Sequence, residues 1–127
     1  MIKEISSLDL ELFGDVNVGG DSPFRKYIGY FVDDEIVGYL IYDVIYDRCE
    51  IVNIFINYEY RNRKFGTNML KYLIDFGKKN NFYNITLEVR KDNLYAIRLY
   101  ENMGFSSVAV RSGYYDGVDG ILMELIL

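Results

Sequence analysis

The chain has no histidine and no tryptophan, and it contains a single cysteine and a single proline among its 127 residues. One cysteine cannot form a disulfide within the chain, and without histidine the usual structural zinc sets cannot be built. No stretch approaches the roughly 20 consecutive apolar residues that a membrane-spanning helix needs, and the first four residues lack the design of a secretory signal. We therefore expect a cytoplasmic protein without a metal site or a membrane partner.

Basic residues are in the minority. The chain has 14 Lys and Arg against 19 Asp and Glu, which gives a formal net charge of −5. This balance argues against nucleic acid as a direct partner, because proteins that bind nucleic acid are usually basic. An acidic surface suits a cationic partner such as a basic polypeptide, although a modest net charge is explained equally simply by solubility.

The residues that are present are typical of a folded domain. Hydrophobic residues make up 50% of the chain and charged residues 26%, which is the balance of a globular protein rather than of a disordered segment. The length suits one hydrophobic core and is too short for two ordinary domains. We expect one domain over residues 1–127, and both a monomer and a homodimer are compatible with it.

Hydrophobic spacing and turn residues predict an alternation of strands and helices. This alternation predicts an α/β fold, in which a mixed antiparallel and parallel sheet is flanked by helices and has a strand–helix–strand crossover at its centre. The expected elements, by residue range, are a strand over 2–5, a short helix from Ser7, a loop over 14–23, strands over 27–32, 36–45 and 48–56, a helix over 64–79, a strand over 85–90, a helix over 93–103, and strands over 105–110 and 121–126 around a connection over 113–120.

The stretch from Glu50 to Leu70 carries the strongest functional signal. An apolar, β-branched run over Ile51–Ile56 is followed by a polar turn that contains Arg61 and Arg63, after which helical spacing begins. A loop that presents backbone N–H groups at the start of a helix, beside two guanidinium groups, is suited to a phosphate or pyrophosphate. The residues alone therefore predict anion binding here.

Six residues of this loop, Arg61-Asn62-Arg63-Lys64-Phe65-Gly66, resemble the pyrophosphate loop of the GCN5-related N-acetyltransferases, the GNAT family. That family's pattern is Gln or Arg, two variable residues, Gly, one variable residue, and Gly or Ala. Arg61 and Gly66 match this pattern, and Lys64 stands in place of the first glycine. Later motifs look like those of the RimI-like branch, which acetylates N-terminal alanines of ribosomal proteins: Leu87-Glu88-Val89-Arg90, Asn93, Ala96, Leu99-Tyr100, Gly104-Phe105, Arg111 and Tyr114-Tyr115.

The resemblance implies the GNAT acyl-CoA N-acyltransferase fold and acetyl-CoA as the acetyl-donor cosubstrate. In that family the strand before the pyrophosphate loop splays from the next parallel strand, and the extended pantetheine arm can add to the open edge. Asn93 has two interpretations, as a helix cap and as a ligand of the cofactor arm. The residues implied to bind the cofactor are Ile54, Phe55, Ile56, Arg61, Asn62, Arg63, Lys64, Phe65, Gly66, Thr67 and Asn93.

Two residues are candidates for the proton transfers that acetylation of an amine requires. Glu88 is expected on the strand face opposite the core residues, where it could serve as the general base, and its alternative is an ordinary exposed carboxylate. Tyr100 has a phenol with a pKa near 10, which suits protonation of a leaving thiolate. Its alternative is an amphipathic core residue with its hydroxyl at the rim.

The acceptor is less defined than the donor. The resemblance implies that Asn53, Arg111, Tyr114 and Tyr115 bind the acceptor, although a tyrosine pair before a turn is also typical of simple packing. An N-terminal α-amino group, as on a ribosomal protein, is the first expectation because its pKa, about 7.7 to 8.0, lies well below that of lysine. A small amine or a lysine is the first alternative, since the family usually has two helices where this chain has only residues 7–23. A catalytically silent CoA-binding module is the second.

Lys64 leaves two interpretations of the loop open. With right-handed helical dihedrals, its Cβ would point away from the pyrophosphate, and its ammonium could add a contact. With a positive φ, the penalty would be about 1 to 2 kcal/mol, equivalent to roughly tenfold weaker cofactor binding.

Overall fold

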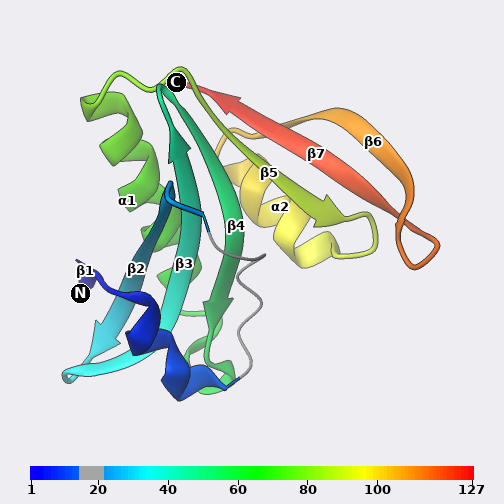
Figure 1. The fold of residues 1–127 in the computed structure, drawn as a ribbon. Helices are drawn as coiled ribbons and strands as arrows, with labels where there is room; N and C mark the ends of the chain where they lie inside the picture. Colours follow the sequence, from blue (N-terminus) through cyan, green and yellow to red (C-terminus); the bar gives the residue numbers. More distant parts are fainter. Residues whose placement is uncertain (15–21) are drawn as a thin grey trace.

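The computed structural model describes residues 1–14 and 22–127, so most of the loop expected over 14–23 lies outside the described residues. The fold is a seven-stranded mixed sheet with helices on both faces (Figure 1). This confirms the predicted fold class and the predicted order of elements. The elements are β1 (Ile2–Glu4), η1 (Ser7–Phe13), β2 (Arg25–Val32), β3 (Glu35–Ile45), β4 (Arg48–Ile56), η2 (Tyr58–Tyr60), α1 (Phe65–Lys79), β5 (Asn84–Arg90), α2 (Leu94–Asn102), β6 (Ser106–Tyr115) and β7 (Val118–Ile126).

The strand order across the sheet is β1-β2-β3-β4-β5-β7-β6. All neighbouring strands are antiparallel except β4 and β5, which run parallel and are joined by the predicted crossover through α1. The last strand, β7, lies between β5 and β6, so two strands that are not adjacent in the sequence become neighbours. Two details differ from the expectation: η1 is a 3-10 rather than an α-helix, and the short η2 turn was not predicted.

Two hydrophobic clusters hold the helices on opposite faces of the sheet. The apolar face of α1, which includes Met69, Leu70 and Leu73, packs in the larger cluster together with Tyr100 of α2. On the other face, Leu10 of η1 packs in a smaller cluster. No helix in the ranges 1–14 and 22–127 is both long enough and apolar enough to cross a membrane.

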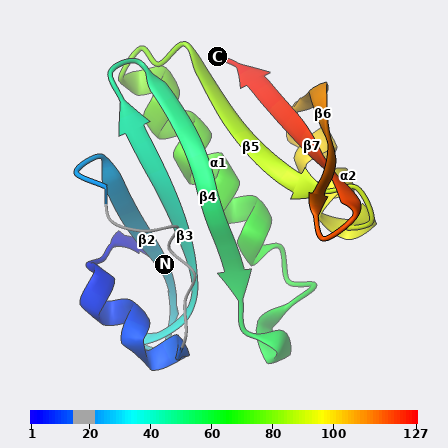
Figure 2. The same ribbon diagram turned by 45° about the vertical axis from the view of Figure 1, so that its right-hand side comes forward.

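The parallel pairing between β4 and β5 is short. It covers only Arg48↔Asn84, Cys49↔Ile85 and Glu50↔Thr86, and beyond these pairs the two strands diverge, as Figure 2 shows. Pairing of β3 with β4 shifts at Val52, which is left between the pairs Tyr42↔Ile51 and Ile41↔Asn53. Such a bulge bends its strand. The expected splay between β4 and β5 is therefore confirmed.

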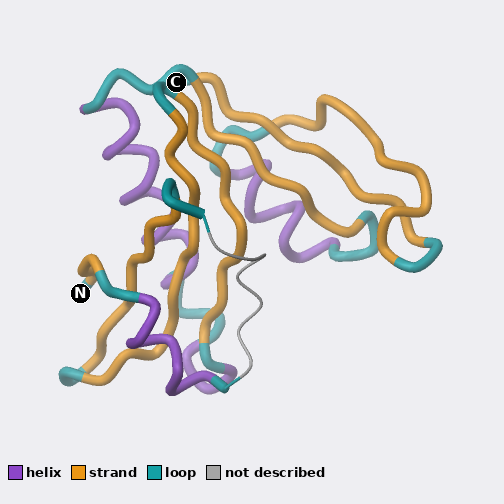
Figure 3. Tube along the Cα trace, viewed as in Figure 1, coloured by secondary structure: helices purple, strands orange, loops and turns teal. Residues whose placement is uncertain are grey.

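The C-terminal hairpin corrects the prediction of a long connection over 113–120. Both strands continue through that segment, and the turn contains only Asp116 and Gly117, with φ of 48° and 93° (Figure 3). Positive φ at both positions is the geometry of a tight hairpin turn, for which Asp-Gly is a strong sequence signal. The expectation was wrong because this dipeptide was not recognised as a turn.

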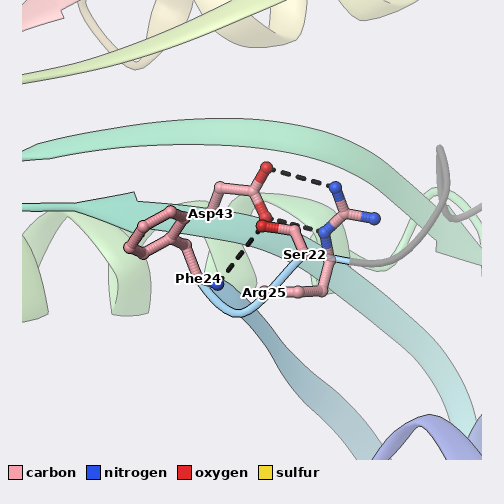
Figure 4. A network of polar contacts seen from close by, with 4 residues as sticks. All are labelled: Ser22, Phe24, Arg25 and Asp43. Carbon is pink, nitrogen blue, oxygen red and sulfur yellow. Dashed lines mark hydrogen bonds and ion pairs between the residues drawn. The ribbon is translucent and has the colours of Figure 1, made fainter.

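An ion pair fixes the start of β2 against β3. The Arg25 Nε and one terminal nitrogen donate to the Asp43 carboxylate at 2.7 and 3.1 Å, and the Phe24 N–H donates to the Ser22 Oγ at 3.2 Å (Figure 4). Both charged side chains are largely buried, and the hydrogen bond to Asp43 raises the pKa of Arg25 further above its usual value. The chain therefore enters the sheet at a defined position after Ser22.

Candidate functional site

A cleft of about 940 Å³ opens where β4 and β5 separate. One wall is β4, the other is β5 with α2, and the first turn of α1 lies at the end of β4 (Figure 2). The cleft therefore coincides with the divergence of the two parallel strands. Its lining residues are Ile51 to Ile56, Tyr58 to Asn62, Lys64 to Thr67, Leu87 to Arg90, Asn93, Tyr95, Ala96, Leu99, Tyr100 and Tyr115.

The β4 wall presents an open strand edge. Ile54, Phe55 and Ile56 pair with β3 on one side, and no described residue of β5 pairs with them on the other. Apart from the Ile56 carbonyl, which accepts a hydrogen bond from Arg61, the backbone groups on that side can bind an extended, amide-containing ligand in the manner of an added strand. The bulge at Val52 also places Asn53 in the cleft lining, where its amide donates to the Tyr39 hydroxyl at 3.4 Å.

The N-terminus of α1 supplies unpaired backbone donors. The first N–H groups of an α-helix have no intrahelical acceptor, and here the first closing bond runs from Asn68 N–H to the Lys64 carbonyl at 2.9 Å. A Cβ added to Gly66 would meet only Leu99 and Ile54, at 3.7 and 4.0 Å, and both of these residues line the cleft. Neither packing nor a positive φ requires glycine at this position. Its effect is to leave the cleft open beside the N–H groups.

The three basic residues of the loop have different roles in the structure. Arg61 is anchored, because its Nε donates to the Ile56 carbonyl at 2.9 Å and its guanidinium lies over the rings of Phe55 and Tyr58. Arg63 lies over Tyr60, 5.3 Å from the ring centroid, and does not line the cleft.

Lys64 lines the cleft and is the N-cap of α1, with φ of 65° and ψ of 19°. The interpretation with right-handed dihedrals is therefore wrong, and the strained one applies. Asn62 is also left-handed, with φ of 63°, although asparagine tolerates this conformation better than lysine does.

Stacked aromatic rings hold this loop against the sheet. Phe65, the first residue of α1, stacks on Tyr30 of β2 with the centroids 4.1 Å apart, and it also stacks with Tyr60 at a centroid distance of 6.2 Å. The ring of Phe65 thus connects the loop to a strand on the far side of β4. This contact helps to fix the direction in which the N–H groups of α1 point.

Glu88 lies on β5 between the buried residues Leu87 and Val89, and its side chain turns to the opposite face, as predicted. The carboxylate is only 17% exposed, and it accepts hydrogen bonds from one Arg111 nitrogen at 3.2 and 3.3 Å. Glu88 is therefore a half-buried carboxylate that lines the cleft and has a specific partner, and its role as the general base stays a prediction.

Tyr100 lies on α2 and lines the cleft, although it is 94% buried by its neighbours, since only 6% of its surface is exposed. Its ring packs 5.9 Å from Phe105. Burial, with a smaller contribution from nearby Tyr115, raises the pKa of Tyr100 to about 12. The phenol therefore stays protonated at neutral pH, and its role as the general acid stays a prediction. The helix that carries it is capped by Asn93, whose side chain accepts from the Ala96 N–H at 3.2 Å.

The predicted acceptor residues divide into two groups. Asn53 and Tyr115 line the cleft, and burial, followed by the Glu88 charge, raises the pKa of Tyr115. Arg111 and Tyr114 do not line it; instead, the Arg111 guanidinium lies 3.9 Å from the centroid of the Tyr114 ring and reaches Glu88 from β6. These two residues lie outside the cleft lining, and Arg111 contacts the lining through Glu88.

Sequence reasoning missed several residues of the cleft. Leu99 could have been found, since it shares a helix face with Ala96 and Tyr100. Several others lie in the η2 turn or at strand and helix ends, where the sequence shows no periodic signal. The lining residues outside the candidate list are Ile51, Val52, Tyr58, Glu59, Tyr60, Leu87, Val89, Arg90, Tyr95, Ala96 and Leu99.

Comparisons with known proteins agree with this geometry. A family model described as "Acetyltransferase (GNAT) family" matches residues 6–105. The [ribosomal protein bS18]-alanine N-acetyltransferase of Escherichia coli K12 is 34% identical over 98 residues, which are 76% of this chain and 66% of that protein. The enzyme of the same name from Salmonella typhimurium is 33% identical over 88 residues, which are 69% of this chain and 60% of that protein. The matched part is thus slightly less than two thirds of these relatives.

Solved structures give the same picture over nearly the whole chain. The crystal structure of the E. coli ribosomal-protein-S18-alanine N-acetyltransferase superposes with a TM-score of 0.87 at 25% identity, covering 99% of this chain and 92% of that one. A Bacillus subtilis acetyltransferase in complex with CoA also has a TM-score of 0.87, at 18% identity, covering 99% of this chain and 97% of that one. The second likeness concerns the fold alone.

Proposed function

This chain belongs to the acetyltransferase (GNAT) family, whose model matches residues 6–105, and from this premise we propose that it transfers an acetyl group from acetyl-CoA to an amine. One observation carries the proposal: a single cleft joins the N-terminus of α1, the open edge of β4, the Glu88 carboxylate and the Tyr100 phenol. These are an anion site, a site for an extended amide chain, a base and an acid. Transfer from a CoA thioester to an amine needs all four.

The donor fits the cleft in one direction. The N–H groups at the start of α1, with Arg61 and Lys64 nearby, suit the pyrophosphate of CoA. The backbone of Ile54, Phe55 and Ile56 suits its amide-containing arm, and the gap left by Gly66 lies between these two sites. In this arrangement the thioester lies deeper in the cleft, toward Tyr100 and Glu88. The acetyl-CoA supplies the activated acyl group, and the protein supplies orientation and proton transfer.

The proposed chemistry assigns one proton transfer to each side chain. Glu88 accepts the proton that the acceptor amine loses, directly or through a water molecule, as the nitrogen bonds to the thioester carbonyl carbon. Free backbone N–H groups of β4 stabilise the oxyanion that forms on the carbonyl oxygen. When the carbon–sulfur bond breaks, Tyr100 donates its proton to the departing sulfur. Tyr100 then recovers a proton from solvent, and Glu88 releases to solvent the proton that it took from the amine.

For the acceptor we propose an N-terminal α-amino group. Two relatives at 34% and 33% identity are named for the N-terminal alanine of ribosomal protein bS18, which makes a ribosomal protein the first candidate. An α-amino group also ionises about two pH units below a lysine side chain, so a carboxylate base can deprotonate it at a lower free-energy cost. A small amine or a lysine is the alternative acceptor.

The test is CoA release from acetyl-CoA, followed with a thiol reagent. The panel contains a peptide with the N-terminal sequence of the host's bS18, the same peptide with a blocked N-terminus and one internal lysine, and spermidine. Cys49 is only 2% exposed, so the folded enzyme contributes little thiol background. Turnover confined to the free N-terminus is expected. Turnover only with the blocked peptide or spermidine would overturn the acceptor, and CoA binding without any turnover would favour a silent CoA-binding module.

A further inference from the structure

A row of three residues crosses the sheet beside the cleft. Gly120 of β7 pairs with Arg90 of β5 on one side and with Arg111 of β6 on the other. Residues that pair directly across antiparallel strands lie on the same face. Glu88, two residues before Arg90 on the same strand, also lies on this face. Two guanidinium groups therefore flank a glycine, with the candidate base diagonally adjacent.

Gly120 leaves a space that neighbouring side chains fill. A Cβ at this position would lie 3.2 Å from Tyr115 Cε2 and 3.3 and 3.4 Å from the Cδ and Cγ of Glu88. The φ of Gly120 lies outside the left-handed region, so the backbone itself does not require glycine. Packing favours it: the Glu88 carboxylate and the Tyr115 ring converge over the bare backbone of β7, and both would have to shift to admit a Cβ.

The charges around this space are paired in a defined way. Arg90 donates two 3.0 Å hydrogen bonds to Asp92, so its charge is paired with a carboxylate other than Glu88. Arg111 reaches across β7 to Glu88, and the ring of Tyr114 covers its guanidinium. A side chain at Gly120 would press on the Glu88 carboxylate that Arg111 contacts. The geometry of the Arg111–Glu88 contact is therefore sensitive to a side chain at this position.

We propose that Gly120 and Arg111 are positioning residues for Glu88: the gap above Gly120 admits the Glu88 carboxylate, and the Arg111 guanidinium holds it at the acceptor side of the cleft. This inference rests on the proposed function, in which Glu88 is the base. It adds a requirement on strand β7, whose residues are absent from the lining of the cleft.

The pairing also bears on the acceptor. With Arg111 in place, the charge of Glu88 is balanced before any acceptor binds, and a second cation on the acceptor would meet a guanidinium rather than a free carboxylate. The site therefore favours an acceptor with a single amine over a polyamine. Removal of the Arg111 charge frees the carboxylate and weakens this preference, whereas a lysine at the same position retains it.

The experiment compares Gly120→Ala, Arg111→Gln and Arg111→Lys with the unmodified enzyme. Gly120→Ala is expected to lower kcat about threefold to tenfold, because the Cβ would displace the Glu88 carboxylate by less than the roughly 1 Å that costs about 100-fold, with the Kd for CoA within about twofold. Arg111→Gln is expected to lower kcat about tenfold and to raise turnover of spermidine relative to the bS18 peptide. Arg111→Lys should retain most of the kcat and most of the preference for the peptide. Ile126→Ala, at the exposed far end of the same strand, is the control for a general disturbance of β7.

A rescue variant separates positioning from folding. Shortening the carboxylate with Glu88→Asp should recover part of the kcat lost in Gly120→Ala, although the same change lowers kcat in the unmodified enzyme. Equal kcat in the unmodified enzyme and in folded Gly120→Ala, or no difference between Arg111→Lys and Arg111→Gln, would overturn the inference. Absence of turnover by the unmodified enzyme on the whole panel would instead count against the proposed function. If Gly120→Ala does not fold, the comparison of Arg111→Gln with Arg111→Lys decides the test alone, because the Arg111 side chain is exposed.

Discussion

Lys64 is the residue whose replacement gives the sharpest physical test of the loop. It is the N-cap of α1 with a left-handed backbone, and its side chain makes no capping hydrogen bond. Within residues 1–14 and 22–127 its ammonium pairs with no carboxylate. A left-handed conformation costs a residue with a Cβ about 1 to 2 kcal/mol. The folded state therefore carries a strain that no contact of this side chain offsets.

Two substitutions separate backbone strain from charge. Lys64→Ala removes the charge and keeps the Cβ, whereas Lys64→Gly removes both. Glycine relieves the strain but adds freedom to the unfolded chain, which offsets about 0.4 to 1 kcal/mol of the gain. We expect the glycine variant to exceed the alanine variant by about 0.5 to 1 kcal/mol in free energy of unfolding. For a domain of this size that is a rise of about 2 to 4 °C in Tm.

The charge of Lys64 is expected to affect the affinity for CoA rather than the free energy of unfolding. The carbonyl of Lys64 accepts the first helical hydrogen bond, and Phe65 beside it is stacked on Tyr30, so the loop holds its shape without a ligand. The strain is then present in both free and bound protein and largely cancels in binding. Lys64→Ala and Lys64→Gly should weaken CoA binding alike, by about threefold to tenfold at low salt, with a smaller difference at high salt because exposed charges are screened.

The measurements are urea unfolding without ligand and calorimetric titration with CoA at two salt concentrations. Equal unfolding free energies for the alanine and glycine variants, together with equal CoA affinities, would refute the assignment of strain to this position. Tighter CoA binding by the glycine variant than by the alanine variant, with equal stabilities, would show that the loop adopts the left-handed conformation only when the ligand is bound. That result would restore the roughly tenfold affinity loss expected from the sequence.

Three other outcomes follow from the cleft and from buried ionisable groups. Glu88→Gln should lower kcat by about 100-fold or more at unchanged CoA affinity, while Glu101→Gln, an exposed carboxylate on α2, should leave kcat unchanged; equal losses would remove Glu88 as the base. Tyr100→Phe should lower kcat similarly, and since burial raises the pKa of Tyr100 to about 12, the unmodified enzyme should show no loss of kcat from its ionisation below about pH 10. Burial also raises the pKa of the Cys49 thiol to about 12 from its usual 9.0. As the pH rises, the unfolded chain therefore loses this proton before the folded protein does. The free energy of unfolding should then fall above pH 9, by at most about 1.4 kcal/mol per pH unit per group. Cys49→Ala should make that fall shallower, and an identical slope would contradict it.

The cofactor side of the cleft could be predicted because its signals are local. The strand, basic loop and helix over 50–70 are consecutive in the sequence, and Gly66 lies where an anion site at a helix N-terminus would place it. The cap at Asn93 and the stop at Gly104 were likewise readable from single positions. The backbone conformation of Lys64 was not, because residue type alone left both dihedral regions open.

The acceptor side could be predicted only in part, because long-range pairing builds it. Glu88 was identified from alternation along one strand, but its partner Arg111 is 23 positions away and reaches it only because β7 lies between β5 and β6. Nothing in the sequence sets that insertion apart from a simple hairpin at the edge of the sheet. Gly120 could not be assigned a role until the register placed it between the two charged residues.

The cleft lies at the shortest pairing between the long strands of the sheet, and this location explains why binding and stability should be coupled. Only three residue pairs join β4 to β5, whereas β5 and β7 share seven. The two halves of the sheet, β1–β4 and β5–β7, are joined by one hydrophobic cluster. It contains Leu40 and Ile51 from the first half and Leu87 and Met123 from the second. A ligand that lies along β4 and also contacts α2 adds contacts across the junction where the strands themselves add none. CoA binding should therefore stabilise the relative position of the two halves as well as the loop proposed to bind the pyrophosphate.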